Sequence, residues 1–292
     1  MEAQILEIKL MGGLGNQLHG VAAGIALSEL KKVPVKFDAS QIPYGSNPTR
    51  RLSVQNLDLG FSNLKFENSA YSPLLGYIFF AGSKARIPIR NLLKVEESVW
   101  SDQGQEPKTA MKSIPDSGRI EGHFLDFEWA EIASKNGMKF LGLRQPLSKK
   151  AEELFNSISS ESIAIHARFG DYKKNSLNFP LLDLDFYLRA LSNFDDVSER
   201  WLFTDDIKSA RKILGARFLA ESKLVPTAGV TDIESFFLLS NFKKIITSNS
   251  TFSSWAAYFA EKNWSAKVVT PVPHMYGDWQ DRLPQTWRRV EI

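Results

Sequence analysis

The second half of the chain alternates short apolar runs with longer segments. The apolar runs have three to five residues, are rich in Ile, Val and Leu, and lie at 162–166, 201–204, 223–225, 244–248 and 267–270. Runs without strict alternation are typical of strands that are buried on both faces. The segments between them have helical length and lie at 185–192, 206–214, 232–239 and 252–260. This rhythm predicts βαβ units and a doubly wound parallel sheet.

The first half opens in the same way. Residues 6–10 alternate apolar with charged side chains, which predicts a strand, and a glycine-rich turn follows at 12–15. From Leu18 to Leu30, apolar residues cover so much of the helical surface that this helix should be largely buried. A second strand is predicted at 33–37, whereas residues 40–115 show only loops and short elements.

The length of 292 residues allows two ordinary domains, because a domain has roughly 150 residues. The polar segment RQPLSKK at 144–150 precedes the first helix of the second unit, so we place the boundary there. We therefore expect an N-terminal domain at 1–150 and a C-terminal domain at 151–292. The predicted fold class is α/β, with two Rossmann-like domains facing a cleft.

Composition narrows the function classes. Apolar residues make up 43% and charged residues 24%, the balance of a soluble globular protein. The net charge of +3 is too small to indicate nucleic-acid binding, and the absence of cysteine excludes disulfides, thiolate metal sites and a cysteine nucleophile. The four histidines show no metal-ligand spacing. With neither a signal peptide nor an apolar run of about twenty residues, we expect a cytoplasmic protein.

The turn at 12–17 (GGLGNQ) stands between the first strand and the first helix. Its glycines let the backbone approach a ligand, and the helix start offers N–H groups and a positive dipole end to an anion. A P-loop would need a Gly-Lys-Ser/Thr ending, which this turn lacks.

Two other interpretations of this turn remain open. A dinucleotide fingerprint would use Gly13, Gly15 and, as the ribose partner, Asp38. Leu18 occupies the place of its third small residue, which weakens that interpretation. The alternative is a tight turn that Asn16 caps.

A second segment of interest is 165–172 (IHARFGDY), where a buried strand enters a loop. Ligands of open α/β sheets bind beyond the carboxyl ends of strands, and Arg168 is predicted there. Its forked, permanently charged guanidinium suits a diphosphate, and Asp171 could orient it. The alternative is a surface pair of Arg168 and Asp171 beside a buried, structural His166.

Two further segments follow predicted strands. Hydroxyls and amides in 248–255 (SNSTFSSW) could cradle phosphate at a helix start, or Ser250 or Thr251 could simply cap that helix. The acids of 203–206 (FTDD) could bind a metal with a diphosphate; we favour helix capping, with contact to a base or ribose. Asp232 could accept two N–H groups from a guanine edge, or serve only as an acid at a helix N-terminus.

The order of these blocks is more specific than any one of them. GGLGNQ, IHARFGDY, FTDD and DIESFFLLSNFKKIITSNSTFSSWAAYF, spread over residues 6–260, strongly resemble the bacterial and animal α-1,2-fucosyltransferase family, glycosyltransferase family 11. Arg51-Leu52 also matches a basic-apolar site usual in that family.

The resemblance implies a GT-B-type glycosyltransferase fold and a GDP-fucose donor. It also implies inverting, metal-independent transfer to the 2-hydroxyl of galactose in a glycan, with no other cofactor. The catalytic residues would be Arg168, which holds the diphosphate, and Asn16, which faces donor and acceptor. The expected donor-binding residues are Gly12, Gly13, Gly15, Gln17, His166, Gly170, Asp171, Asp205, Asp232, Asn249, Ser250 and Thr251.

The chain departs from the family pattern at several places. The family has two arginines in series before Gly-Asp, but Phe169 takes the second place, so one cation fewer would face the nucleotide. His19-Gly20 replaces the usual Phe-Gln, and Ser254 replaces the first Trp of a Ser-Trp-Trp sequence. The block at 122–127 (GHFLDF) matches the family only loosely, so the acceptor is the least specified feature. Glu121, His123 and Asp126 are open candidates for a general base.

Four other interpretations are weighed against this one. An NAD-dependent oxidoreductase would use the glycine turn with Asp38. A protein that binds a GDP-sugar or a glycan without catalysis would fit the loss of a cation at Phe169, and another GDP-sugar could be the donor. Finally, the apolar run 74–82 with the basic residues up to Lys94 could dock on the inner face of an anionic membrane, or simply be a buried element beside a solvated loop.

Overall fold

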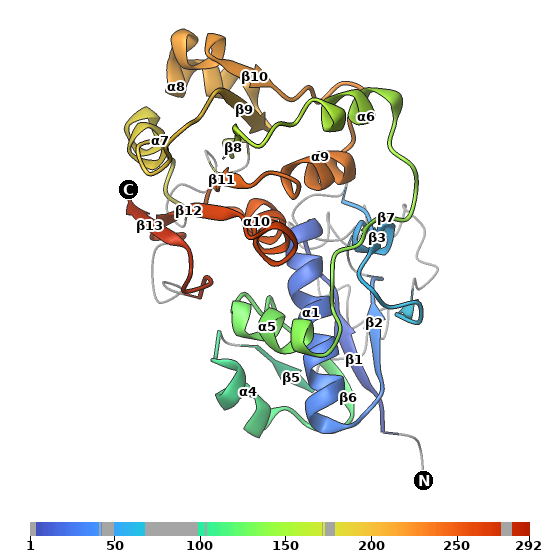
Figure 1. Cartoon of the computed structure of the whole chain (residues 1–292). Helices are drawn as coiled ribbons and strands as arrows, with labels where there is room; N and C mark the ends of the chain where they lie inside the picture. Colours follow the sequence, from blue (N-terminus) through green and yellow to red (C-terminus); the bar gives the residue numbers. More distant parts are fainter. Residues whose placement is uncertain are drawn as a thin grey trace, which may run out of the picture. The chain divides into compact units, whose positions relative to one another are not determined.

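The computed structural model describes residues 4–40, 42, 50–67, 99–102, 104–170, 172, 179–275 and 282–292. The chain forms two compact units, Met1–Leu141 and Gly142–Ile292, and each contains a parallel sheet (Figure 1). The predicted α/β class with two Rossmann-like units is confirmed. The units divide after residue 141, before the boundary expected at 150.

Among the described helices, none combines the length and the apolar character that crossing a bilayer requires. The segment 74–94, which was considered for docking on a membrane surface, lies outside the described residues.

The first unit has a five-stranded parallel sheet in the order β4-β2-β1-β6-β5. The strands of this unit are β1 (Leu6–Lys9), β2 (Val35–Asp38), β3 (Leu57–Asp58), β4 (Phe66–Glu67), β5 (Trp100–Ser101) and β6 (Gly118–Glu121). Its helices are α1 (Leu14–Lys31), the 3-10 helix η2 (Val54–Asn56), α4 (Pro107–Ser113) and α5 (Phe127–Lys135).

One face of this sheet is apolar and packs against α1. Two glycines of α1, one turn apart, allow the close approach. A Cβ atom at Gly24 would lie 2.5 Å from the Phe37 ring, and one at Gly20 would lie 2.7 Å from Leu10. Residues of α1 are buried almost without interruption from Leu14 to Leu27, which confirms the predicted buried helix.

The opposite face of the same sheet carries charged side chains. Glu7 of β1 forms ion pairs with Lys36 of β2 and Arg119 of β6. One pleat further along, Lys9 lies 2.8 Å from Glu121 and is only 4% exposed. Parallel sheets are usually apolar on both faces. Here strict alternation along the strands separates an apolar face from a charged one.

The second unit has a six-stranded parallel sheet in the order β10-β9-β8-β11-β12-β13. The strands of this unit are β7 (Gly142–Leu143), β8 (Ser162–Ala167), β9 (Glu199–Thr204), β10 (Ser222–Leu224), β11 (Lys244–Ile246), β12 (Lys267–Val272) and β13 (Arg288–Glu291). Its helices are α6 (Lys149–Asn156), α7 (Leu184–Leu191), α8 (Ile207–Ala220), α9 (Asp232–Leu239) and α10 (Thr251–Trp264).

These elements confirm the predicted alternation, with one corrected boundary and one additional strand. Helix α8 continues to Ala220, beyond the predicted end at 214, because the chain resumes helical conformation after Gly215 (φ +83°). Strand β13 was not predicted, since its sequence RRVE is mostly charged and carries no apolar run.

The strand order identifies the point in the second sheet where the direction of chain progression reverses. Counted from β8 in chain order, the strands lie in the order 3-2-1-4-5-6, the arrangement of a Rossmann fold. After β8 the chain builds one side of the sheet with β9 and β10, and then builds the other side with β11, β12 and β13. The reversal therefore lies between β8 and β11.

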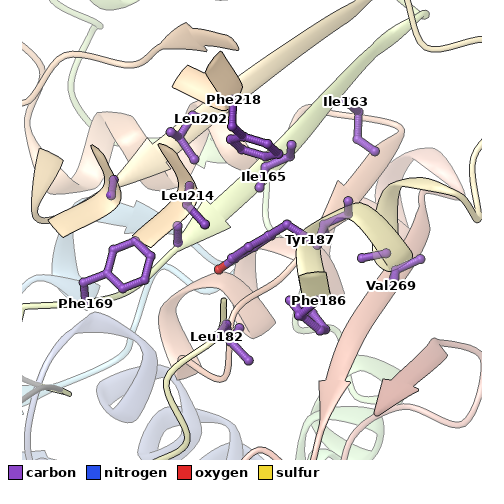
Figure 2. Close-up of a cluster of buried hydrophobic side chains, with 14 residues drawn as sticks. Ile163, Ile165, Phe169, Leu182, Phe186, Tyr187, Leu202, Leu214, Phe218 and Val269 are labelled. Atoms are coloured by element: carbon purple, nitrogen blue, oxygen red, sulfur yellow. The ribbon is translucent and has the colours of Figure 1, made fainter. Parts of the chain in front are cut away.

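The core of this unit includes a residue from the loop after β8. Phe169 is fully buried in a cluster with Phe186, Tyr187, Leu202 and Leu214 (Figure 2). Phe169, which stands where the family has a second arginine, therefore contributes its side chain to the core.

We expect Phe169→Ala to lower the free energy of unfolding by about 3–5 kcal/mol, because it removes a ring from a packed core and leaves a cavity. Phe169→Leu should cost less than about 1.5 kcal/mol, since it keeps most of the apolar volume. Urea titrations followed by tryptophan fluorescence measure both values. Equal unfolding midpoints for Phe169→Ala and the unchanged protein would contradict the buried position.

Candidate functional site

Most predicted site residues of the second unit lie at one edge of its sheet. Arg168 follows β8, Asp205 follows β9, and residues 247–250 lead from β11 into α10. Parallel strands have their carboxyl ends at the same edge, and ligands of such sheets bind there, next to the reversal of strand order. The structure therefore brings these residues together where a ligand site is expected.

Arg168 is held by an acid from the neighbouring strand. Ala167 pairs with Thr204 in the register of β8 and β9, so the residues that follow, Arg168 and Asp205, are neighbours. The Arg168 Nη1 atom lies 3.2 Å from Asp205 Oδ2, and the arginine side chain keeps 30% of its surface exposed. An oriented and accessible guanidinium suits recognition of a phosphate group.

The same carboxylate fixes the backbone beyond Arg168. Asp205 Oδ1 accepts a hydrogen bond from the Phe169 amide at 2.9 Å, and Oδ2 accepts one from the Gly170 amide at 3.0 Å. A Cβ atom at Gly170 would lie 2.5 Å from Asp205 Oδ2, so the close approach requires glycine. Gly170 thus has a structural reason to be present, whatever the ligand.

Two predictions about acids change at this point. Asp171, expected to orient Arg168, lies outside the described residues, and Asp205 performs that role. Both Asp205 oxygens bond to the loop, which argues against the predicted contact of Asp205 with a base or ribose. Asp206 is the N-cap of α8, as predicted. The strand register could have identified Asp205, but a single sequence does not state which strands pair.

His166 is a buried residue that supports the site. It is buried, and its Nδ1 atom lies 2.8 Å from the Ser248 hydroxyl, which joins the ends of β8 and β11 across the reversal point. The Tyr187 hydroxyl donates to the His166 carbonyl oxygen. Burial, with a smaller effect of the Arg168 charge, lowers the pKa of His166 to about 3, so the ring is neutral. His166 is therefore a structural residue here, and we withdraw it as a direct donor ligand.

Asn249 bonds to two described residues between β8 and α7, Tyr172 and Pro180. The buried Asn249 donates from Nδ2 to the Pro180 carbonyl oxygen, and the Tyr172 hydroxyl donates to the Asn249 carbonyl oxygen, both at 2.8 Å. The Tyr172 ring stacks on Phe179 and lies 6.0 Å from the Arg168 guanidinium. Asn249 was predicted as a donor ligand and Tyr172 was given no role, although both stand in the motifs.

Helix α10 begins at the reversal point without a side-chain cap. Ser250 occupies the N-cap position, but its hydroxyl makes no capping hydrogen bond, so the predicted capping by Ser250 is wrong. In contrast, each of the helices α5, α6, α7, α8 and α9 has a side chain that caps its first turn. An N-terminus without a side-chain cap keeps amide donors available to an anion. Thr251 is the first residue of α10 and lies at the same place.

Asp232 lies in the first turn of α9 and is exposed. The helix itself is capped by Thr231 and Glu234, which bond reciprocally in a capping box, so Asp232 is not needed for that purpose. Because α9 leads back to the start of β11, its N-terminus points to the carboxyl edge of the sheet. The helix also contacts α10 through Phe236 and Phe252, whose ring centroids lie 5.4 Å apart.

In the first unit, the glycine turn that follows β1 lies at the carboxyl edge of the sheet, as Arg168 does in the second unit. Gly12 has a φ of +72°, and a Cβ atom there would lie 2.7 Å from Asn16 Nδ2. Gly13 is the N-cap of α1 and cannot cap it with a side chain. The interpretation in which Asn16 caps the helix is therefore wrong, since Asn16 stands inside its first turn. Gly15 is buried in the same turn.

Gln17 has a different role from the predicted one. Its side chain is fully buried and uses both its donor and its acceptor atoms within the protein. Nε2 donates to the carbonyl oxygens of Gly12 and Arg51, and Oε1 accepts from the amides of Ser53 and Val54. We therefore no longer propose Gln17 as a donor ligand: it ties the glycine turn to the loop at 51–54.

The two alternative chemistries find little support. Asp38 is buried, and its Oδ1 atom accepts a hydrogen bond from the Ser40 amide, so it is poorly placed to bind a ribose. Leu18 is fully buried in the place of the third small residue of a dinucleotide fingerprint. Within the described ranges, no group of three or more His, Asp or Glu side chains is arranged to hold a metal ion.

Comparison with known proteins finds a family match for part of the chain and a relative over its full length. Residues 143–273, which contain the carboxyl edge described above, match the model of "Glycosyl transferase family 11". The chain is 24% identical over 302 aligned positions to an α-1,2-colitosyltransferase of Escherichia coli, covering 98% of this chain and 99% of that protein.

Solved structures with a similar course of the chain include two glycosyltransferases. One is the α-1,6-fucosyltransferase NodZ, soaked with GDP-fucose, at 12% identity with a TM-score of 0.49 over 87% of this chain and 92% of that one. The other is the Escherichia coli heptosyltransferase WaaC with ADP, at 14% identity with a TM-score of 0.44 over 99% and 93%. Residues 143–273 thus match glycosyl transferase family 11, and the chain is similar over its full length to an α-1,2-colitosyltransferase.

Proposed function

We propose that this protein transfers L-fucose from GDP-fucose to the 2-hydroxyl of a galactose residue in a glycan, with inversion and without a metal ion. The proposal rests on one observation. Arg168, which Asp205 orients, and the start of α10 both lie at the carboxyl edge of the second sheet, next to its reversal point. This arrangement offers a fixed positive charge and amide donors to a diphosphate.

The donor would bind the second unit. The diphosphate would lie between Arg168 and the amides and hydroxyls at Ser250 and Thr251, with Asn249 shaping the loop above. Asp232, exposed at the start of α9, has two carboxylate oxygens for the N–H groups of a guanine edge. The acceptor would bind the first unit, where Asn16 at the glycine turn would position it.

The chemical step requires stabilisation of the charge that develops on the leaving group more than a covalent intermediate. The acceptor oxygen forms a bond to the anomeric carbon as the bond from that carbon to the diphosphate breaks, and the electron pair leaves with GDP. Negative charge therefore grows on the diphosphate, next to Arg168 and the helix start. Because these groups are held in place before the reaction, they stabilise the transition state without reorganising.

A colitosyl donor is the second candidate. It is favoured by the similarity of the whole chain to the α-1,2-colitosyltransferase, which extends through both units. The same diphosphate and guanine contacts serve either GDP-sugar. Parallel transfer assays with GDP-fucose and GDP-colitose on a panel of β-galactosides, with EDTA present, test donor, acceptor and metal independence together. A protein that binds GDP but transfers neither sugar to any galactoside would fit the non-catalytic alternative.

We expect Arg168→Ala to weaken GDP binding and to lower kcat for transfer by about 10²–10³-fold, the loss typical of a deleted charge-stabilising donor. Isothermal titration with GDP and a GDP-release assay measure the two effects.

The matched control is Arg200→Ala, which also removes an arginine of this unit. Arg200 pairs with Glu221 at 3.1 Å near the amino end of β9, away from the proposed site. This control should bind and transfer normally. A folded Arg168→Ala variant with normal turnover would refute the role of Arg168.

Asp205→Asn should reduce transfer by roughly 10²-fold, because a guanidinium displaced by about 1 Å stabilises the leaving group poorly. The effect should depend on Arg168. In the Arg168→Ala background, the same substitution should change the rate little, since residues that act as one unit are not additive. A double-mutant cycle on kcat tests this prediction, and fully additive losses would show that Asp205 acts independently of Arg168.

A further inference from the structure

A second place of interest is the turn that follows β6 in the first unit. The sheet order β4-β2-β1-β6-β5 means that the chain builds one side after β1 and the other side with β5 and β6. The ends of β1 and β6 therefore flank the reversal point of this sheet, where α/β sheets bind ligands. The glycine turn follows β1, and Gly122-His123-Phe124 follows β6.

The turn after β6 is held in a strained conformation. Phe124 has a φ of +48°, which a bulky residue adopts only when its surroundings enforce it. Its amide donates to Asp102 Oδ2 at 3.0 Å, and its buried ring stacks on Trp100 and contacts Trp129 edge-on. Gly122 packs so closely on Asp102 that a Cβ atom would lie 2.2 Å from the Asp102 Cβ. The backbone on both sides of His123 is thus fixed.

His123 is the residue that this turn presents. Its side chain is exposed, and within the described part of the chain it has no hydrogen-bond partner. The charged groups whose fields reach it are Asp102, Glu121 and Arg50. Its ring can therefore accept a proton from a bound molecule.

The acids near this turn already have partners within the protein. Asp126 caps α5 by accepting the Glu128 amide at 2.8 Å, and Glu121 forms an ion pair with Lys9. Asp102 accepts the amides of Gly104 and Phe124. These carboxylates are therefore already engaged by partners within the protein.

We propose that His123 is the general base of the transfer reaction: it takes the proton of the acceptor hydroxyl as that oxygen bonds to the anomeric carbon. The bond from the anomeric carbon to the diphosphate breaks in the same step, GDP leaves with the electron pair, and the imidazolium later releases the proton to water. This inference rests on the proposed function, since it assigns a base to that reaction.

The surroundings of His123 lower its pKa. Partial removal of the ring from water, together with the charge of Arg50, lowers the pKa of His123 below its ordinary value of 6.5, against the opposing effects of Asp102 and Glu121. His19, which lies nearby on α1, is buried, and its pKa of about 3 keeps it neutral. His123 is therefore unprotonated at neutral pH. Transfer should fall on the acid side, as pH drops through the lowered pKa of His123.

The test compares the unchanged protein with His123→Gln, His123→Ala and the control Asp116→Asn. Asp116 is an exposed acid of the same unit that pairs with Lys31. We expect His123→Gln to lose about 10²-fold or more in kcat, to keep its GDP affinity, and to lose the acid limb of the pH profile. Added imidazole should restore part of the activity of His123→Ala. Asp116→Asn should behave like the unchanged protein.

The outcomes separate this inference from the proposed function. Normal kcat with an unchanged acid limb in His123→Gln would overturn the role of His123 while leaving the fucosyl transfer intact. If the unchanged protein transfers no sugar in any assay, the proposed function fails first, and the inference about the base fails with it. Thermal unfolding of each variant shows whether a loss of rate reflects a loss of fold.

Discussion

One carboxylate sets the geometry at the carboxyl edge of the second sheet. Asp205 accepts hydrogen bonds from two successive amides, those of Phe169 and Gly170, and also pairs with the Arg168 guanidinium. Three consecutive residues are thereby held to a neighbouring strand whose register is fixed by the sheet. With the backbone fixed, the side chains diverge: Arg168 keeps an accessible surface, and Phe169 enters the core. The site and the core of this unit depend on the same acid.

Most described helices away from the reversal points have a side-chain cap; α4, which begins at Pro107, does not. Helices α5 to α9 use a side chain to satisfy their first turn. The helices α1 and α10 start at the reversal points of their sheets, after Gly13 and Ser250, and have no side-chain cap. Amides that the protein does not satisfy with its own side chains can bind water or a ligand instead. In both units, the helix that starts at the reversal point of the sheet, where a ligand is expected to bind, therefore has no side-chain cap.

Much of the second unit could be predicted from the sequence, because its strands are short apolar runs and its helices have their own signals. The position of Arg168 after a strand, and the resemblance to family 11, followed from local motifs. The partner of Arg168 could not be predicted, since Asp205 comes from another strand and only the pairing of β8 with β9 brings it near. Gln17 and His166 stand in motifs that resemble a binding site, yet Gln17 bonds only within the protein, and His166 Nδ1 bonds Ser248. A motif indicates that a residue matters, and the packing shows whether its role is structural or in binding.

The charged face of the first sheet has a consequence for the placement of β6. Glu7 lies opposite Lys36 and Arg119, and Lys9 lies opposite Glu121, in adjacent rows across three strands. A slip of one residue would turn the charged side chains toward α1 and the apolar ones away from it. The alternation therefore works against misaligned pairing of β1 with β6. Because the turn at Gly122 begins one residue after Glu121, these ion pairs also decide how far along the sheet His123 emerges.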